Sequence, residues 1–310
     1  MTDADYTRRY FSDEAGRWLA TAYGGDDHPV SYPVGARRVR LALDVIGARL
    51  GAARGRLLDL GCGGGDLCVE AAGLGFETTG IDLAEGMIAE AEARRRALPP
   101  SVGQRLTFRV GDVLGADLPA GAFDAVSALG LVEYLDDDVA FFRAVARWLK
   151  PGGVVVVSFR NRLFNLASLN DYTRREIESG AATGLLVELT SLRPGPGLHD
   201  RLADLVGRLR EALPALEEAL AADRASGAAV NGASFAGHRR QHTPREAATA
   251  AATAGLSEAG FIGVHPHPFP PALEAAAPRF YNRLAGVLEA LEAAPSSLAW
   301  SSAFLGVFTR

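Results

Sequence analysis

A short apolar run that ends in clustered glycines, Leu57–Gly65 (LLDLGCGGG), constrains the fold of this chain more than any other feature. Four of its last five residues are glycines, and the residues that follow have a helical pattern. A glycine loop between a strand and a helix lets a ligand approach the backbone closely, at the positive end of the helix dipole. Asp82 ends the next apolar run, where a carboxylate can accept hydrogen bonds from both hydroxyls of a ribose. The pattern therefore predicts a binding site for a nucleotide-like ligand.

The charges around this loop separate two kinds of nucleotide-like ligand. The dinucleotide-binding pattern needs a third glycine at position 66, and this chain has Asp66 there. A carboxylate is repelled by a pyrophosphate, whereas it is attracted to a sulfonium ligand with a free amino group. The negative charge of Asp59, within the strand that precedes the loop, favours the same cationic ligand. The charges therefore favour S-adenosylmethionine (SAM) over a nicotinamide dinucleotide as the cofactor.

Strand and helix signals alternate strictly around the loop. Short apolar runs predict strands, and apolar residues spaced three and four apart predict the helices between them. Strands separated by single helices indicate parallel βαβ units, hence an α/β protein with a doubly wound sheet. The predicted strands are Arg56–Leu60, Phe76–Asp82, Leu106–Val110, Phe123–Ala128 and Val154–Phe159, and the predicted helices are Asp66–Leu74, Glu85–Ala97 and Val139–Leu149, the last ended by Pro151–Gly153.

Other patterns flank this core. From Arg160 to about His242 there is no convincing strand, and leucines between Leu202 and Leu220 mark an amphipathic helix. We therefore divide the chain into an N-terminal helical cap or lid (1–36), a SAM-binding core (37–159), a helical insertion that caps the acceptor (160–242) and the C-terminal part of the core (243–310). The predicted outer elements are helices Tyr6–Tyr23, Arg37–Leu50 and Thr243–Ala259 with Thr243 as N-cap, strands Phe261–His265 and Ala303–Thr309, and helical segments in Ala272–Ala293 broken at Pro278.

Five short motifs follow one another in the order that a known family shows. The chain resembles the class I SAM-dependent methyltransferases, of the small-molecule type. The resemblance implies a Rossmann-like α/β fold with a doubly wound, seven-stranded, mostly parallel sheet and a terminal antiparallel strand, to which this chain adds a helical cap and an insertion. The motifs are Asp59–Gly65, Gly80–Met87, Gly111–Val113, Phe123–Val126 and Leu149–Gly153, with Ala259–Phe261 (AGF) and Phe304–Phe308 matching the end of the family's sheet.

The resemblance also implies which residues bind SAM. Asp82 is expected to hold the ribose, the apolar residues after it to flank the adenine, and Asp112 to reach the adenine amino group. Members of the family often use N-terminal helices as a lid, in which Tyr23 or Arg37 would meet the cofactor carboxylate. The predicted cofactor-binding residues are Asp59, Gly61, Cys62, Gly63, Gly65, Asp82, Leu83, Met87, Asp112, Val113, Leu129, Tyr23 and Arg37.

The candidate catalytic residues follow the fourth and fifth predicted strands. In a doubly wound sheet, ligands lie beyond the carboxyl ends of the strands. Glu133 and Tyr134 come after the fourth strand and Asn161 after the fifth, so these side chains are candidates for contact with the acceptor. His242, just before the helix that returns to the sheet, is the first choice for a general base. We predict no metal at this site.

The insertion and the residues after the fourth strand indicate the type of acceptor. A large insertion favours an enclosed pocket, and hence a small molecule from secondary-metabolite or sugar biosynthesis. The N/D-P-P-Y motif expected for amino-group methylation is missing, since Ala128–Leu131 stands in its place, and this favours O- or C-methylation. Three alternatives stay open. They are a SAM-utilising enzyme that cyclises its substrate or transfers the aminocarboxypropyl group and releases methylthioadenosine, a non-catalytic SAM-binding partner subunit, and an NAD oxidoreductase, which Asp66 disfavours.

Composition limits the partners. The formal net charge of −5 provides no general basic field for nucleic acid. Two cysteines, Cys62 and Cys68, are too few and wrongly spaced for a zinc site or a disulfide framework. No apolar signal region and no long apolar run are visible. We therefore expect a soluble cytoplasmic protein, a monomer or homodimer, whose partner is a small-molecule acceptor rather than nucleic acid or a membrane.

Overall fold

The computed structural model describes residues 3–16, 19, 31–51, 55–193, 195–226 and 239–310. Its centre is one seven-stranded sheet with the order β3-β2-β1-β4-β5-β7-β6. Neighbouring strands among β1 to β5 run parallel, whereas β7 runs antiparallel to both β5 and β6. The predicted doubly wound sheet with a terminal antiparallel strand is therefore confirmed. The strands are β1 (Arg56–Leu60), β2 (Glu77–Asp82), β3 (Leu106–Val110), β4 (Phe123–Ala128), β5 (Leu149–Arg160), β6 (Ser257–Pro266) and β7 (Ser301–Thr309).

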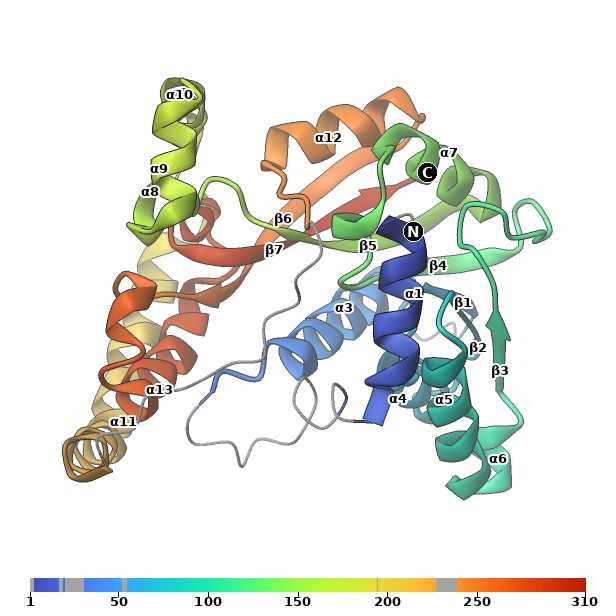
Figure 1. Cartoon of the computed structure of the whole chain (residues 1–310), viewed down its shortest axis with the longest axis horizontal. Helices are drawn as coiled ribbons and strands as arrows, with labels where there is room; N and C mark the ends of the chain where they lie inside the picture. Colours follow the sequence, from blue (N-terminus) through green and yellow to red (C-terminus); the bar gives the residue numbers. More distant parts are fainter. Residues whose placement is uncertain (1–2, 17–18, 20–30, 52–54, 194, 227–238) are drawn as a thin grey trace.

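Helices cover both faces of the sheet (Figure 1). One face packs against α3 (Val34–Leu50) and α4 (Asp66–Gly73), and α5 (Glu85–Ala97) packs beside them. The other face packs against α7 (Asp138–Trp148) and α12 (Pro244–Thr253). The buried residues of α7 lie three and four apart, as an amphipathic helix over a sheet requires: Phe141, Phe142, Val145 and Trp148.

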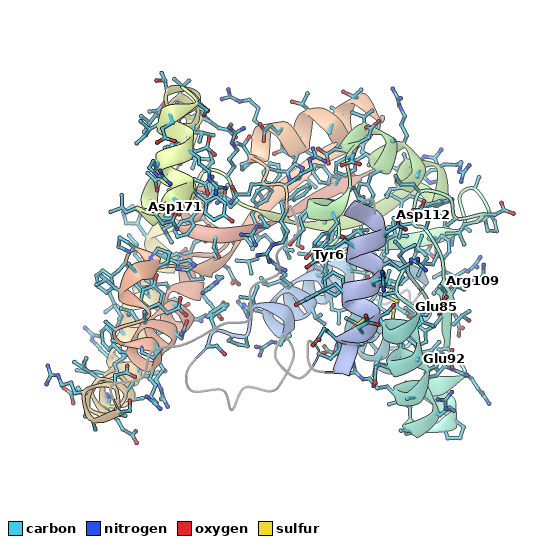
Figure 2. The ribbon with its side chains drawn as sticks, viewed as in Figure 1. Tyr6, Glu85, Glu92, Arg109, Asp112 and Asp171 are labelled. Carbon is cyan, nitrogen blue, oxygen red and sulfur yellow. The ribbon has the colours of Figure 1, made fainter. Side chains whose placement is uncertain are left out.

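The chain between β5 and β6 forms helices at one end of the sheet. They are α8 (Asn165–Ser168), α9 (Asp171–Glu178), α10 (Ala182–Ser191) and the long α11 (Leu198–Ser226), which packs along α13 (Pro278–Leu288). Figure 2 shows Asp171, the first residue of α9, at the opposite end of the molecule from Asp112, which follows β3. This helical segment therefore lies far from the adenine side of the predicted cofactor site. No helix among the described residues is long and apolar enough to cross a membrane.

The N-terminal helix α1 (Asp3–Asp13) lies on the first turn of α5. The two helices approach so closely at Gly86 that a Cβ there would overlap the carbonyl oxygen of Ser12. Phe11 packs with Ala84 and Met87 beneath it. The helix is thus seated over the carboxyl end of β2 (Figure 1).

Several predicted boundaries differ from the structure, and three of the differences have a clear local cause. The helix predicted for Thr243–Ala259 ends at Thr253, since Gly255 adopts a φ of +83°, which a helix does not allow, and the chain then enters β6 at Ser257. Strand β5 begins at Leu149 rather than Val154, because Leu149 already pairs with Phe123. Pro278 begins α13 instead of breaking a helix, at a position where its missing N–H costs nothing.

The smaller helical elements complete the chain. They are α6 (Pro100–Gly103) and four 3-10 turns, η1 (Val132–Tyr134), η2 (Pro271–Leu273), η3 (Glu289–Leu291) and η4 (Pro295–Ala299), among the described residues. Of these, η1 follows β4 and carries two of the predicted catalytic residues.

Candidate functional site

The glycine loop between β1 and α4 has the backbone conformation that only glycine adopts without strain. Gly61, Gly63 and Gly65 have φ angles of +66°, +52° and +79°. A Cβ added to Gly63 would project into open space, where the nearest atom is the Met87 sulfur at 4.0 Å. The loop therefore leaves room beside its backbone for a ligand.

Asp82 lies across from this loop at the carboxyl end of β2. Its carboxylate accepts hydrogen bonds from the backbone N–H groups of Gly63 at 2.9 Å and Ala84 at 2.8 Å. Burial raises the pKa of this carboxyl, and the two backbone hydrogen bonds oppose the rise. Asp112, after β3, is exposed and accepts a hydrogen bond from the backbone N–H of Leu114 at 3.0 Å. Both acids keep carboxylate oxygens at the ends of adjacent strands, as ribose and adenine recognition requires.

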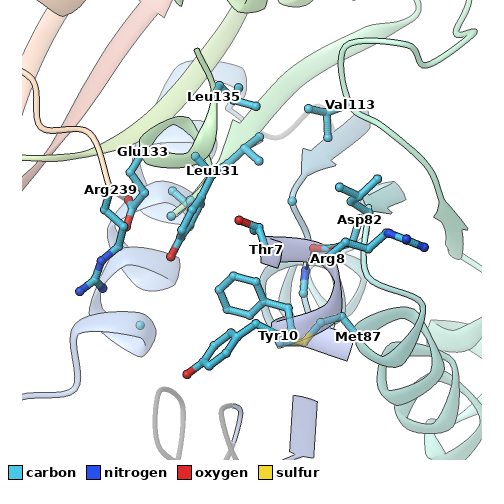
Figure 3. A pocket seen from close by; sticks show the side chains of 18 of the residues that line it. Thr7, Arg8, Tyr10, Asp82, Met87, Val113, Leu131, Glu133, Leu135 and Arg239 are labelled. Atoms are coloured by element: carbon cyan, nitrogen blue, oxygen red, sulfur yellow. Dashed lines mark hydrogen bonds between the residues drawn. The ribbon is translucent and has the colours of Figure 1, made fainter. Parts of the chain in front are cut away.

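A cavity of about 670 Å³ opens over the loop. This volume is within the range of pockets that hold a cofactor or a drug-sized ligand. Figure 3 shows Asp82, Met87 and Val113 on one side of it and Glu133 and Arg239 on the other. The lining residues come from α1 (Asp5, Thr7, Arg8, Tyr10, Phe11, with Glu14 after it), from the start of α3 and the residues before it (Ser31, Tyr32, Val34, Gly35, Arg38), from the core (Gly61, Gly63, Asp82, Leu83, Met87, Asp112, Val113, Leu129, Gly130, Leu131, Glu133, Tyr134, Leu135, Arg160) and from Arg239.

Helix α1 closes the cavity through its aromatic side chains. Phe11 meets the ring of Tyr134 edge-on, with 5.7 Å between the ring centroids. Tyr10 packs edge-on against Phe11 at 5.2 Å. The polar residues Thr7 and Arg8 of the same helix face the cavity (Figure 3). The helix thus forms one wall of the cavity.

Most of the predicted cofactor-binding residues line this cavity. They belong to four separate loops at the carboxyl ends of β1, β2, β3 and β4, which the sheet order brings together. The predicted residues that line it are Gly61, Gly63, Asp82, Leu83, Met87, Asp112, Val113 and Leu129. Tyr23 lies outside the described residues.

The two acids that argued for a cationic cofactor do not face the cavity. Asp59 is buried beneath the loop, where it accepts hydrogen bonds from Ser127 Oγ at 2.7 Å and Cys68 Sγ at 3.5 Å. Burial raises the pKa of the Asp59 carboxyl to about 7. Asp66 is paired with Arg94 at 2.7 Å. The electrostatic argument from these two acids is therefore wrong, since one is hidden and the other is neutralised.

Three further residues that were predicted to bind the cofactor do not line the cavity, and each stabilises the fold instead. Cys62 is buried against α4, and Gly65 caps α4, where a Cβ would meet the ring of Phe108 at 2.8 Å. Arg37 does not line the cavity, because its guanidinium pairs with Glu292 at 2.5 Å. The next residue, Arg38, lines the cavity in its place.

Glu133 and Tyr134 both line the cavity, on the side away from Asp82. Glu133 is 6% exposed, and its Oε2 atom is buried without a hydrogen-bond partner among the described residues. Burial, and then the charge of Glu133, raise the pKa of the Tyr134 phenol. Tyr134 therefore remains a protonated hydrogen-bond donor near neutral pH.

The other two predicted catalytic residues form hydrogen bonds within the core, outside the cavity. Asn161 is 1% exposed, and its amide donates to the carbonyl oxygens of Leu298 at 2.7 Å and Ser301 at 2.8 Å. His242 is 2% exposed, and its Nε2 lies 3.1 Å from Asp138. Neither lines the cavity, so the prediction that they act in catalysis is corrected: both hold the chain beside the end of β5.

Sequence reasoning missed the residues that α1 and α3 contribute, and it missed Arg239. The resemblance implies an N-terminal lid, but no motif distinguishes Tyr10 or Phe11 within that segment. Arg38 and Arg239 carried no signal, because arginine supplies all but one of the positive residues of this chain. Within the described residues, no group of three or more potential ligands is placed to hold a metal ion.

Comparisons with known proteins agree with this geometry. Residues 58–157 match the family model described as a methyltransferase domain. A ubiquinone biosynthesis O-methyltransferase of Xanthomonas oryzae is 44% identical over 123 residues, which cover 39% of this chain and 49% of that protein. A second, from Xanthomonas campestris, is 42% identical over 122 residues, with the same coverage. The chain thus spans about half the length of the curated relatives it matches.

Solved structures show the same fold over the whole chain. Magnesium protoporphyrin IX methyltransferase from Synechocystis, with bound SAH, has a TM-score of 0.56 at 14% identity and covers 100% of both chains. Geranyl diphosphate C-methyltransferase from Streptomyces coelicolor has a TM-score of 0.54 at 17% identity and covers 100% of this chain and 98% of that one. The cyclase SpnF is equally similar, with a TM-score of 0.54 at 17% identity and 100% and 97% coverage.

The family match falls on the part of the chain that holds the glycine loop, Asp82 and Asp112, and the sheet is doubly wound with a terminal antiparallel strand, as the motifs implied. Residues 58–157 therefore match a methyltransferase domain, and the chain has the Rossmann-like fold of the solved methyltransferases.

Proposed function

We propose that this protein transfers the methyl group of SAM to an oxygen or carbon of a small-molecule acceptor. The observation that carries the proposal is a single cavity that joins the cofactor motifs at Asp82 to the buried Glu133 and the half-buried Tyr134. Oxygen is favoured as the acceptor atom, since the related Xanthomonas proteins are named O-methyltransferases.

The residues of the cavity fit SAM. The open space beside Gly63 admits the cofactor next to the loop backbone, and a side chain at this position would fill it. Among the residues that line the cavity, the Asp82 carboxylate would bind the ribose hydroxyls, Leu83 and Met87 would flank the adenine, and Asp112 would accept a hydrogen bond from the adenine amino group. SAM, when bound, supplies the electrophilic methyl group on its sulfonium.

The protein contributes orientation and a place for the acceptor proton. Methyl transfer depends chiefly on bringing the nucleophile to about 3 Å and aligning it. Glu133 offers a carboxylate oxygen without a partner, so it can accept the proton of an acceptor hydroxyl. Tyr134, which stays protonated, donates a hydrogen bond beside it. Phe11 closes the cavity above Tyr134 and excludes water.

The acceptor class follows from the shape and charge of the molecule. A concave cavity beside α1 that is only partly open to solvent suits a metabolite better than a protein or nucleic acid. The net charge of −5 supports the exclusion of nucleic acid. A monomer or homodimer in the cytoplasm remains our prediction from the sequence, as does the division of the chain into cap, core and insertion.

One alternative has a specific observation in its favour. The similarity to the cyclase SpnF is as high as the similarity to geranyl diphosphate C-methyltransferase, so the fold alone permits a reaction other than methyl transfer. The products distinguish the two. Methyl transfer yields S-adenosylhomocysteine (SAH), attack at another carbon of the sulfonium yields methylthioadenosine, and a cyclase that leaves SAM unchanged yields neither.

The test is incubation of the protein with SAM and a panel of hydroxylated small molecules, followed by mass spectrometry of cofactor and acceptor. We expect SAH and a methylated acceptor in equal amounts. The variant Glu133→Gln should retain SAH binding and lose activity by about a hundredfold, the usual scale of a general base. SAH binding without any product from the panel would support the partner-subunit alternative, and methylthioadenosine would replace methyl transfer by another reaction.

A further inference from the structure

Three arginines line the part of the cavity that the cofactor motifs leave open. They come from distant parts of the chain: Arg38 from α3, Arg160 from the end of β5 and Arg239 from the residues before α12. Figure 3 shows Arg239 next to Glu133, across the cavity from Asp82. The arginines are therefore placed on the acceptor side of the site.

The three guanidinium groups surround Tyr134. Each lies near enough for its charge to lower the pKa of that phenol, against the larger effects of burial and Glu133. Arg38 Nη1 also lies 3.6 Å from where a Cβ would stand on Gly130, at the carboxyl end of β4. The groups thus converge on one region rather than extending separately into solvent.

The lack of partners for two of them contrasts with the arginines elsewhere in the molecule. Three half-buried arginines outside the cavity each have a carboxylate close by: Arg162 pairs with Glu176 at 2.8 Å, Arg240 with Asp138 at 2.7 Å, and Arg279 with Asp223 at 3.1 Å. Within the described part of the chain, Arg38 and Arg160 form no ion pair, and the Nε atom of each is buried without a hydrogen-bond partner.

Unpaired guanidinium groups in a half-buried cavity cost stability, so a ligand that pairs with them binds favourably. Among the described residues whose charges act on Tyr134, three are arginines and one is the carboxylate of Glu133. The cofactor adds its own positive sulfonium and amino groups, and its single carboxylate can satisfy at most one arginine. Since Arg38 and Arg160 both stand without an ion pair among the described residues, at least one of these two guanidinium groups is left for the acceptor.

We propose that the acceptor carries a compact oxyanion, a carboxylate or a phosphate, which Arg160 binds beside Tyr134, in the part of the cavity that Arg38 and Arg239 also line. The planar fork of guanidinium matches either oxyanion with two parallel hydrogen bonds. This inference rests on the proposed function, because it describes the acceptor of that reaction. It explains why Arg160 stands without a partner at the end of β5, where Asn161 and Arg162 are both engaged.

The test uses the full chain saturated with SAH, so that the cofactor's own carboxylate site is filled. Three aromatic probes of similar shape are titrated by ligand-observed NMR: benzoate, phenyl phosphate and the neutral benzamide. We expect at least one anionic probe to bind about tenfold more tightly than benzamide, the scale of one charged hydrogen bond. The stronger of the two anions identifies the carboxylate or the phosphate as the natural group.

Two variants and a matched control locate the binding. Arg160→Gln should weaken the anionic probe about tenfold and Arg160→Lys less, since lysine keeps the charge but loses the fork. Arg174→Gln removes an exposed arginine on α9 that pairs with Asp171 at 3.1 Å, and it should change nothing. SAH affinity, measured on each variant, reports whether the site still folds.

The outcomes separate this inference from the proposed function. Anionic probes that bind no better than benzamide to the SAH-loaded protein, or equally to the Arg160→Gln and Arg174→Gln variants, would overturn the inference and leave the proposed function standing. Failure of the wild-type protein to bind SAH would overturn both.

Discussion

Two helical regions lie outside the sheet, and the sequence assigned both of them as covers of the active site. The N-terminal region, α1 with residues 31–38, contributes Thr7, Tyr10, Phe11 and Arg38 to the cavity. The helices between β5 and β6, α8 to α11, contribute none of its described lining residues. The first region lines the cavity, whereas the second lies at the far end of the sheet (Figures 1 and 2).

The contacts of the second region explain the difference. Helix α11 carries a buried carboxylate, Asp223, which accepts hydrogen bonds from the backbone N–H groups of Arg279 at 3.3 Å and Phe280 at 3.0 Å in the first turn of α13. It thus stabilises the start of a helix, where free N–H groups need acceptors. The length of an insertion therefore does not predict that it covers the active-site cavity. Its role depends on where along the sheet it packs.

The largest expected effect is on stability, from the region without cavity contacts. Leu216 of α11 is 6% exposed, so Leu216→Ala should lower the free energy of unfolding by about 3 kcal/mol. The affinity for SAH should be unchanged at temperatures where the variant is folded. Denaturant unfolding and calorimetric SAH titration measure the two quantities. A loss of SAH affinity in this variant would contradict the separation of the two regions.

A substitution beneath α1 should instead lower the activity. Gly86→Ala keeps α5 helical but forces α1 away, because the added Cβ would overlap the carbonyl oxygen of Ser12. We expect methyl transfer to fall by about a hundredfold, the scale of a displacement of ~1 Å in an active site. Alanine favours a helix over glycine by about 1 kcal/mol, so the loss would not come from a weakened α5.

The matched control for the lid is Gly184→Ala in α10, where the added Cβ meets no atom within 4 Å. It should leave both SAH affinity and activity at wild-type values. Equal effects of the two glycine substitutions, compared by initial rates at saturating SAM, would show that α1 is not required as a cover.

The cofactor half of the site was predictable because its residues are contiguous in short motifs. Gly63, Asp82 and Asp112 each stand at or just after the end of a strand, and the alternation of strands and helices predicts parallel strands whose carboxyl ends lie at one edge of the sheet. The acceptor half was not predictable, since Arg38, Arg160 and Arg239 meet only in three dimensions. The local sequence pattern around each arginine does not show that the three side chains lie close together in the folded chain.

The prediction of SAM as the cofactor rested in part on a charge argument that the structure does not support. Asp59 and Asp66 argued for a cationic cofactor by charge, yet Asp59 is buried against Ser127 and Asp66 is neutralised by Arg94. A sequence shows the charge of a side chain but not its direction or its partner. The succession of motifs, rather than their electrostatics, identified the family.

Lowering the pH should change the free energy of unfolding in opposite directions through the two regions, and by an intermediate amount. Hydrogen bonding to Arg162 lowers the pKa of Glu176, at the base of α9, below its usual 4.5. A lowered acid pKa gives stability that is present above pH 4.5 and is lost as the pH falls through the folded-state value. Glu176→Gln should therefore cost about 1–2 kcal/mol at pH 7 and remove this acid-range loss.

The pH dependence beneath the lid has the opposite sign. Burial raises the pKa of Asp59 to about 7 from 3.8, so the folded protein binds that proton more tightly than the unfolded chain does. The free energy of unfolding should rise as the pH falls from about 8 toward 4, and Asp59→Asn should remove this slope. Unfolding curves across pH 3–9 measure both effects. A wild-type curve that falls monotonically from pH 8 to pH 4 would contradict the assignment to Asp59.

The smallest expected effect is at the junction where the chain returns from the insertion to the sheet. Thr243 caps α12: its hydroxyl accepts the backbone N–H of Glu246 at 3.2 Å, and its own N–H donates to the Glu246 carboxylate at 2.8 Å. Thr243→Ala should lower the free energy of unfolding by about 1 kcal/mol. SAH affinity should not change, since His242 is held to β5 by its own backbone hydrogen bond to the Arg160 carbonyl at 2.9 Å.

The control for the junction is Thr249→Ala, an exposed threonine in the middle of the same helix. Alanine is the better helix former there, so this variant should be neutral or slightly more stable. Equal destabilisation by the two threonine substitutions would show that the cap contributes nothing beyond helix propensity. A loss of anion binding in Thr243→Ala alone would instead show that α12 holds Arg239 in place, and so that the junction belongs functionally to the lid side of the molecule rather than to the insertion.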